Sequence, residues 1–399
     1  MPSRPPRVLL VLPQLPQDPA AGAARSLTII SEMLAAAGFA VRALAVTASQ
    51  GAGHLDAPAY LSSLGINPQV ERHVQRRELR FSQRGIDFRL LDVGELTLAD
   101  WETALGRQFD RLFHDELRDF HPDIVFTYGG SEGERRRRVR ARRHGAKLVF
   151  GLRNEAYLTP HSLDDVDAVL TPSQYLSDLY RNALALDSTP LPPPILPEEV
   201  QCQEHDPIFV TMINPSPEKG ITVLARLAEV LSVERPDLPI LVIESRGTAG
   251  LLASVALLGG FDLRRHENIM VSPSVPLPRD IYSPTRVLIV PSLLESAGRV
   301  VEEALLNGIP PVVSDRGGLP EMCAGAGFVL PLPKTLQVAD RMPVAAEVVR
   351  PWVDTIVRLC DDDQFYQAAC QKARAAGDRY RPEHLAPRYA EFFRRVLAG

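Results

Sequence analysis

The sequence predicts an α/β fold of two doubly wound domains, each built on a parallel sheet, that face each other across a cleft. Short apolar runs alternate with helical patterns along nearly the whole chain, which is typical of strands joined by crossover helices. A proline-rich stretch interrupts this alternation near the middle of the chain. The length of 399 residues exceeds what one hydrophobic core usually supports, and 45% hydrophobic residues are enough to fill two cores.

The predicted strands of the first domain, residues 1–190, alternate with helical segments. After the first strand, Gly22-Ala23-Ala24-Arg25-Ser26 opens a helix that continues to Ala37, and Gly38 ends it. This start suits any doubly wound domain. The expected strands are Arg7–Leu12, Val41–Val46, Ile124–Tyr128, Lys147–Leu152 and Ala168–Leu170.

Residues 191–199 form the predicted linker. Its core has the sequence LPPPILP, and because proline restricts the backbone, this segment predicts a stiff hinge. A C-terminal domain is expected over residues 200–381, followed by a last helix within residues 382–399. Helices are also expected over 345–361, where Pro351 should break or restart the helix, and over 363–380. The strands of this domain are expected at Ile208–Ile213, Ile240–Ser245, Ile269–Ser272, Val287–Val290, Pro311–Ser314 and Gly327–Leu330.

The segment Glu295 to Glu321, ESAGRVVEEALLNGIPPVVSDRGGLPE, carries the strongest functional signal. It follows one predicted strand and contains the next, so it predicts strand, turn, helix and strand, with Gly298 at the helix start. The first amides of a helix lack intrahelical partners and lie at the positive end of its dipole. A diphosphate is therefore a suitable ligand for this turn, whose five residues are Ser296, Ala297, Gly298, Arg299 and Val300.

Two carboxylates flank this turn, Glu295 before it and Glu303 about one helical turn beyond it. Each can accept hydrogen bonds from vicinal hydroxyls, one pair on a hexose and one on a ribose, as a sugar nucleotide presents them. The alternative is structural, because the helix dipole favours Glu302 and Glu303 in the first turns and Glu295 can cap the turn.

The pair is part of a longer pattern. The same region contains Pro291-Ser292, Ala304, Gly308-Ile309-Pro310, Val312-Val313-Ser314, Gly317-Gly318 and Glu321. It resembles the donor-binding signature of the retaining glycosyltransferases of family 4, which have the GT-B fold. The resemblance implies an enzyme that moves a hexose-type sugar from a nucleotide-sugar donor to an acceptor hydroxyl. It also implies a front-face mechanism with no metal or other cofactor, the donor being UDP-, GDP- or ADP-linked.

The resemblance assigns roles to further residues. It implies that Glu295 orients the donor hexose, that Glu303 holds the ribose and that Lys219, in IFVTMINPSPEKG, contacts the donor phosphates. Ser173, in DAVLTPSQY, would cap the helix after the last strand of the first domain. The last helix, 382–399, would cross back onto the first domain. The acceptor-side loop would include Gly22, Ala23 and Arg25.

The sequence departs from that family at two places. Where relatives usually carry a phosphate-binding arginine, it has Asn214 and two prolines, so Arg299 or Arg246 is the candidate replacement. Where many relatives have a histidine near the reaction centre, it has Arg153 followed by Asn154. These departures leave open a catalytically weak GT-B protein that serves as a sugar-nucleotide-binding or partner subunit. Another GT-B enzyme, such as an epimerase or phosphorylase, is a further alternative.

The charge distribution bears on partners. A net charge of −5 argues against general nucleic-acid binding, although Arg135 to Arg143 hold seven arginines in nine residues on a predicted helix. That helix could contact anionic lipid, an acidic acceptor or a partner protein, or be merely solvated. The basic stretch Glu71 to Arg84 is equally ambiguous.

The cysteines and the start of the chain bear on location. The four cysteines lack metal-ligand spacing, so no metal and no disulfide is expected. The first apolar run is too short for a signal peptide, and no run approaches a membrane span. We therefore expect a cytoplasmic protein, peripheral to the inner face of the membrane if the arginine-rich helix binds lipid.

Overall fold

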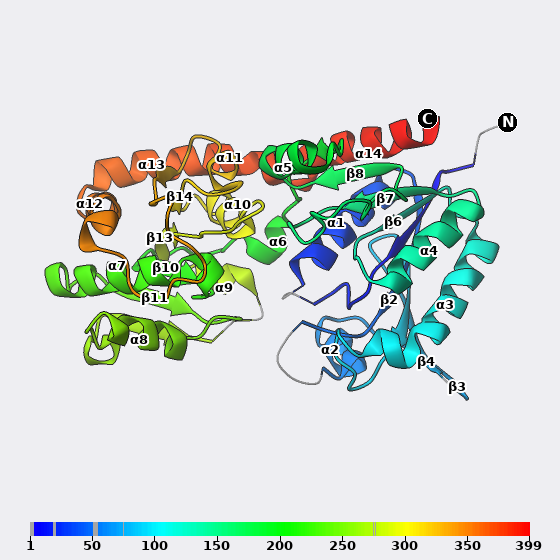
Figure 1. Cartoon of the computed structure of the whole chain (residues 1–399), viewed down its shortest axis with the longest axis horizontal. Helices are drawn as coiled ribbons and strands as arrows, with labels where there is room; N and C mark the ends of the chain where they lie inside the picture. The colour runs from blue at the N-terminus through cyan, green and yellow to red at the C-terminus, as the bar shows by residue number, and fades with distance from the viewer. Residues whose placement is uncertain (1–3, 19–20, 51–54, 75, 274, 276) are drawn as a thin grey trace. The chain divides into compact units, whose positions relative to one another are not determined.

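A computed structural model describes residues 4–18, 21–50, 55–74, 76–273, 275 and 277–399. The chain forms two compact units (Figure 1). Unit 1 comprises Met1–Pro172, Ser177–Pro194 and Pro382–Gly399, and unit 2 comprises Ser173–Leu176 and Ile195–Arg381. The main division, between residues 194 and 195, falls inside the proline-rich stretch. The last helix, α14 (Pro382–Ala398), groups with unit 1.

Unit 1 contains a nine-stranded sheet in the order β3-β4-β5-β2-β1-β6-β7-β8-β9. All neighbouring strands are parallel except β3 with β4 and β4 with β5, which are antiparallel. The strands are β1 (Arg7–Val11), β2 (Ala40–Val46), β3 (Gln69–His73), β4 (Arg76–Gln83), β5 (Ile86–Asp92), β6 (Ile124–Thr127), β7 (Lys147–Gly151), β8 (Ala168–Thr171) and β9 (Thr189–Pro190). The parallel strands that the sequence predicts are present, but the antiparallel edge is an addition to the expected sheet.

The hydrophobic pattern of the sequence does not predict the antiparallel edge, because charged side chains occupy interior positions of its strands. Leu79 and Phe81 of β4 face the apolar core, whereas Glu78 on the other face is fully buried. Arginines surround this carboxylate, and Arg89 Nε of β5 donates to Glu78 Oε2 at 2.8 Å. Burial raises the pKa of Glu78, but the hydrogen bonds from Arg89 and Arg76 more than offset this and hold it below its usual value.

Helices cover both faces of this sheet. One apolar core joins the sheet to α1 (Gly22–Ala36) and α14, where Phe393 packs edge-on against Phe126 at 5.2 Å between ring centroids. The other core joins the sheet to α3 (Trp101–Phe120) and α4 (Glu132–Arg143), which lie side by side (Figure 1). The remaining helices of this part of the chain are α2 (Ala57–Ser63) and α5 (Gln174–Leu184), whose first residues group with unit 2.

Unit 2 contains a six-stranded, fully parallel sheet in the order β12-β11-β10-β13-β14-β15. The strands are β10 (Phe209–Ile213), β11 (Ile240–Ile243), β12 (Ile269–Ser272), β13 (Thr285–Val290), β14 (Pro311–Ser314) and β15 (Phe328–Leu330). The order reverses between β10 and β13. In doubly wound sheets, ligands bind beyond the carboxyl ends of the strands at this reversal.

The helices of unit 2 also lie on both faces of its sheet. One core holds α7 (Ile221–Glu234), α8 (Ala249–Leu258), α12 (Ala346–Asp361) and α13 (Asp363–Gly377), and the other holds α6 (Pro197–Val200), α10 (Arg299–Leu306) and α11 (Leu319–Met322). The expected break at Pro351 is absent, because α12 continues through this residue. Val349, Trp352, Val353 and Ile356 all pack in the core, and this apolar face compensates for the backbone hydrogen bond that proline cannot donate.

Candidate functional site

The candidate site lies at the reversal of the unit 2 sheet, where β10 and β13 end. The loop after β10 and the loop after β13 are held together by two hydrogen bonds. The amides of Leu293 and Leu294 donate to the carbonyl oxygen of Glu218 at 2.8 and 3.2 Å. A Cβ at Gly220, whose φ is +78°, would collide with the carbonyl of Pro291. A glycine is therefore required for the two loops to approach this closely.

Lys219 and Glu295 meet at this junction. The Lys219 ammonium donates a charge-assisted hydrogen bond to Glu295 Oε2, and the hydroxyl of Ser292 lies 3.5 Å from the same oxygen. The side chains keep 23% and 14% of their surface exposed, so both groups are accessible from solvent. The structure thus brings together the two residues to which the sequence assigns the donor phosphates and the donor hexose.

The loop of Asn214 has a structural role of its own. Asn214 adopts a φ of +62°, and its side-chain oxygen accepts a hydrogen bond from the amide of Gly247 at 2.7 Å. This bond joins the loop after β10 to the loop after β11, in which Arg246 is exposed. The pKa of Glu218 lies below its usual value, chiefly because the backbone amide of Glu218 itself bonds to the carboxylate. The positive charges of Arg246 and Lys219 make smaller contributions in the same direction. Arg246 is therefore close enough to this loop to add positive charge to it.

The turn before α10 packs closely against the backbone of Gly317 and Gly318. Gly298 is the N-cap of α10 with a φ of +106°, and the amide of Gly318 donates to the carbonyl of Glu295 at 3.0 Å. A Cβ at Gly317 would collide with that same carbonyl, and one at Gly318 would collide with the carbonyl of Ser296. The Gly317-Gly318 pair is thus explained by close packing against the turn.

The amides of this turn remain available as donors. Within the described part of the chain, the backbone N–H groups of residues 296–300 donate no hydrogen bond to another protein group, and the amide of Val301 bonds to Gly298 at 2.8 Å. Ser296 and Arg299 are half-buried. Free amides at a helix start, next to a lysine, are the groups that bind phosphate oxygens.

Further hydrogen bonds, made by residues 173–175, hold this turn and the neighbouring Glu321 in place. The hydroxyl of Ser173 donates to the carbonyl of Ser296 at 2.5 Å, and it also accepts the amide of Leu176, as the predicted helix cap. The carboxylate of Glu321 accepts the amides of Gln174 and Tyr175 at 2.9 and 3.2 Å. The carbonyl side of the turn is therefore occupied by protein donors.

Glu303 is held by two protein groups. Glu303 is 6% exposed; its Oε1 accepts a hydrogen bond from Arg299 Nε at 2.7 Å, and its Oε2 accepts one from the hydroxyl of Tyr282 at 2.7 Å. Burial and the neighbouring Glu303 carboxylate raise the pKa of Tyr282 well above its usual value, so this hydroxyl stays protonated and donates. Burial acts to lower the pKa of Arg299, but Glu303 raises it above its usual value.

This arrangement adds a contact that the predicted roles of the two charged residues did not include. The sequence suggested Arg299 for the donor phosphates and Glu303 for the ribose, whereas the structure binds them to each other. Two of the carboxylate's lone pairs are used by Tyr282 and Arg299, which leaves two for a ligand. Tyr282 precedes β13 in the sequence with no spacing signal that would have marked it as part of the site.

The remaining predicted residues lie in unit 1. Arg153 and Asn154 follow β7, and the side-chain oxygen of Asn154 accepts the amide of Ala156 at 3.0 Å. The carbonyl of Asn154 accepts the hydroxyl of Tyr180 at 3.0 Å, so Asn154 is tied into a local turn.

Helix α1, which holds the residues predicted for the acceptor side, begins at Gly22 and Ala23, and Arg25 Nη1 in its first turn lies 4.0 Å from Glu32 Oε1. A side chain at Gly22 would meet no atom within 4 Å, so the close packing seen around Gly317 has no counterpart there.

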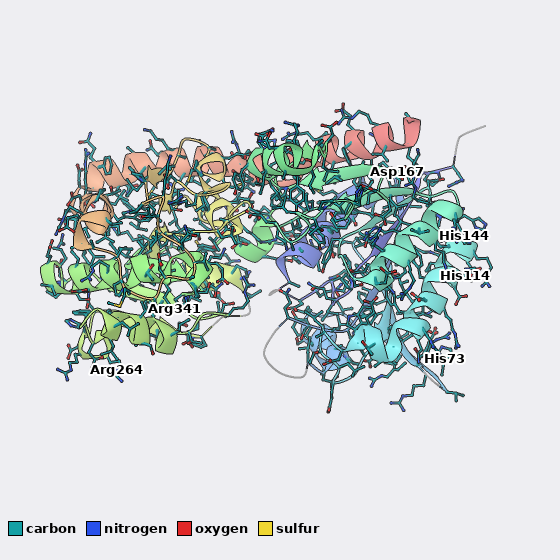
Figure 2. The ribbon with its side chains drawn as sticks, in the orientation of Figure 1. His73, His114, His144, Asp167, Arg264 and Arg341 are labelled. Carbon is teal, nitrogen blue, oxygen red and sulfur yellow. The ribbon has the colours of Figure 1, made fainter. Side chains whose placement is uncertain are left out.

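The arrangement of acidic and histidine side chains offers little for a metal ion. Within the described ranges, one group of acidic and histidine side chains is close enough to share an ion, namely Glu71, His73 and Glu78 of the β3–β4 hairpin. Figure 2 shows His73 at the end of this hairpin. Arginines already bind Glu78, among them Arg89 at 2.8 Å, and these cations oppose a metal ion there.

Comparisons with known proteins bear on the family and the fold. Residues 195–342 match the family model of glycosyl transferases group 1. A search of curated protein sequences finds no match. Within the described chain, no helix combines the length and apolar character needed to cross a membrane.

Solved structures similar to the whole chain have low sequence identity. Sucrose-phosphate synthase from Thermosynechococcus elongatus is 15% identical with a TM-score of 0.68, over 98% of this chain and 99% of that one. The catalytic domain of starch synthase IV from Arabidopsis thaliana, bound to ADP and acarbose, is 12% identical with a TM-score of 0.70, over 99% and 100%.

Anabaena HepE in complex with UDP and glucose is 15% identical with a TM-score of 0.65, over 97% and 99%. These structures confirm the predicted α/β fold of two Rossmann-like units. The chain has the GT-B fold, and its residues 195–342 match the glycosyl transferases group 1 model.

Proposed function

We propose that this protein is a retaining glycosyltransferase that moves a hexose-type sugar from a nucleotide-sugar donor to an acceptor hydroxyl without a metal ion. The observation that carries the proposal is the meeting of Lys219 and Glu295 beside the free amides of the turn before α10. The match of residues 195–342 to a glycosyltransferase model supports it. HepE, which shares the fold, was solved with UDP and glucose, and starch synthase IV with ADP.

The proposed chemistry follows from these charges. The bond between the anomeric carbon and the diphosphate oxygen breaks while the acceptor oxygen bonds to that carbon from the same face. The acceptor's proton passes to the departing phosphate oxygen, so no protein nucleophile is required. Lys219 and the amides of residues 296–300 stabilise the charge that develops on the diphosphate, and Glu295 orients the hexose.

Glu303 contributes to donor binding in a second way. It accepts the ribose hydroxyls on the two lone pairs that Tyr282 and Arg299 leave open, so its protein partners fix its orientation. Arg153 and Asn154 act as catalytic groups near the anomeric carbon, and Gly22, Ala23 and Arg25 lie on the acceptor side. The donor is UDP-, GDP- or ADP-linked, the acceptor is anionic or lipid-linked, and the protein works in the cytoplasm.

A thermal-shift screen tests the donor site. UDP, GDP, ADP and TDP and their common sugar conjugates are compared on wild type, Lys219→Met and Glu295→Gln. Lys372→Met is the matched control, because this exposed lysine of α13 lies in the same unit. A ligand at a hundred times its Kd adds about 2.7 kcal/mol to the stability of the native state.

The expected result is a rise in Tm with one nucleotide class that Lys219→Met abolishes and Lys372→Met retains. Wild-type protein that responds to no nucleotide or conjugate would refute the proposal. Retention is tested by the anomeric configuration of the product, read by NMR. An inverted product would refute the front-face mechanism while leaving the donor site intact.

A second candidate is a catalytically weak GT-B protein that binds sugar nucleotides for a partner enzyme. The ion pair of Arg299 with Glu303 favours it, because the guanidinium that would replace the missing phosphate-binding arginine is already engaged by a carboxylate. A nucleotide that raises the Tm, but whose sugar conjugates show neither hydrolysis nor transfer to any acceptor, would favour this candidate. Transfer of the sugar at any measurable rate would exclude it.

A further inference from the structure

Two helices of unit 1, α3 and α4, lie in contact and run in the same direction. Arg137 of α4 forms ion pairs with Glu102 and with Asp110 of α3, the latter at 2.8 Å, and its guanidinium lies 5.0 Å from the ring centre of Phe109. Farther along, the rings of His114 and His144 meet edge-on at 5.7 Å (Figure 2). The two helices therefore present their outer sides as one continuous surface.

This surface is lined by two matching stripes of basic side chains. Arg107, Arg111 and His114 follow one another on α3 at the spacing i, i+4 and i+7, and all three are exposed. Arg136, Arg140 and Arg143 repeat this spacing on α4 and are also exposed. Because such spacing places side chains on one side of a helix, each stripe is continuous. We call these six residues the α3–α4 basic face.

The buried and the exposed arginines of α4 differ in their partners. Arg137 and Arg138 are buried and paired with carboxylates, the latter with Asp165 at 2.9 Å. Among the described residues, the five arginines of the basic face have no acidic partner. Like charges at i and i+4 destabilise a helix by a few tenths of a kcal/mol, whereas Glu132 and Asp115 each offer one opposite charge at this spacing, to Arg136 and Arg111, so the stripes contribute little to the stability of the fold. The exposed guanidinium groups are therefore accessible to an external anion.

An anionic lipid surface fits this face best. Val139, 39% exposed, lies among the outer arginines of α4, where it can enter the headgroup region while the guanidinium groups bind lipid phosphates. The aromatic side chains of α3, Trp101, Phe109, Phe113 and Phe120, are all buried. Single-stranded nucleic acid would need exposed aromatic rings for base stacking, and the described part of these helices offers none.

We propose that the α3–α4 basic face docks the protein on an anionic lipid bilayer. The proposal does not depend on the chemistry of unit 2, since every residue of the face lies in unit 1. It gives the protein a location at which a lipid-linked or anionic acceptor would be concentrated. Each arginine near such a surface changes the affinity by about fivefold, so two removals should weaken binding about 25-fold.

Vesicle flotation of the full chain tests this. Vesicles of phosphatidylcholine alone are compared with vesicles that contain about 30% phosphatidylglycerol, at ionic strength of about 0.15 M. Arg136→Gln/Arg140→Gln is the test variant. Arg388→Gln/Arg395→Gln is the matched control, because it removes two exposed arginines from α14 of the same unit and changes the net charge equally.

The expected result is binding of wild type to the anionic vesicles only, about 25-fold weaker in the test variant and unchanged in the control. Absence of wild-type binding, or equal weakening in both variants, would overturn the proposal. A single-stranded RNA oligonucleotide is the competing probe. If RNA binds more tightly than the vesicles and the test variant loses that binding, the face is a nucleic-acid site and the lipid proposal fails.

Discussion

Replacing Glu303 by alanine should destabilise unit 2 strongly, because its carboxylate joins the fully buried Tyr282 to the half-buried Arg299. Removing one partner of a buried ion pair costs about 3–5 kcal/mol. Arg299 keeps 26% of its side chain exposed, so water can partly rehydrate the guanidinium and we place this part at about 2–3 kcal/mol. The hydroxyl of Tyr282, which is fully buried, loses its acceptor, and this adds about 1–2 kcal/mol.

The total of about 3–5 kcal/mol can be measured on unit 2 alone. Trp352 is fully buried in unit 2 and Trp101 lies in unit 1, so a Trp101→Phe background makes the fluorescence report on Trp352. Urea unfolding in this background is compared for Glu303, Glu303→Ala and Glu303→Gln. The glutamine variant retains an acceptor for Tyr282 and should lose only about 1–2 kcal/mol.

Glu267→Ala, at an exposed position of the same unit, is the control and should change stability by less than about 0.5 kcal/mol. A loss below about 1 kcal/mol for Glu303→Ala would refute the contacts with Tyr282 and Arg299 as stabilising interactions. Glu303 would then be a free ligand group, as the sequence suggested.

Two further predictions concern other parts of the fold. Gly317→Ala should destabilise unit 2 by more than about 2 kcal/mol and abolish nucleotide binding, because its Cβ collides with the carbonyl of Glu295. Gly325→Ala, also at positive φ but in open space, should cost only about 1 kcal/mol, and equal thermal shifts would contradict this reasoning. Glu78, with its pKa below the usual 4.5, should stabilise unit 1 fully above that pH and lose its contribution as the pH falls through the lowered value. Urea unfolding from pH 5 downwards should therefore show a smaller acid dependence in Glu78→Gln, and an unchanged dependence would contradict the ion pairs.

The sequence predicted those features that depend on local patterns. Apolar runs bounded by turn residues marked the parallel strands, and the proline-rich stretch marked the division between the units. The turn before α10 also carried a local signal, because Gly317 and Gly318 are each required by a close backbone contact and Gly298 has a positive φ. Such requirements can be seen in the sequence, because they restrict particular positions to glycine.

Features that depend on residues far apart in the sequence could not be predicted from local patterns. The antiparallel edge of the first sheet buries Glu78, which can be interior only because Arg89 and other arginines approach it from neighbouring strands. Tyr282 joins the site through a hydrogen bond to Glu303, 21 residues away. Pro351 was misjudged because core packing outweighs the lost hydrogen bond. In each case tertiary contacts decide the outcome.

The charges at the candidate site lead to one more prediction, on salt dependence. The cations Lys219 and Arg299 are matched by Glu295 and Glu303, and Arg246 is near Glu218. An arriving diphosphate therefore meets little net positive charge from side chains, and the free amides of residues 296–300 must supply much of its stabilisation. Contacts to such amides are local and poorly screened, unlike attraction between exposed charges.

Nucleotide affinity should therefore weaken by less than about threefold between about 0.05 and 0.5 M salt, measured by calorimetry. The basic face of unit 1 offers the internal comparison, because binding through exposed arginines should fall steeply over the same range. A nucleotide Kd that rises more than about tenfold would mean that unpaired cations, and not the backbone of the turn, hold the diphosphate. Arg246 would then be the first residue to replace, since it is exposed and its positive charge helps to lower the pKa of Glu218 in this loop.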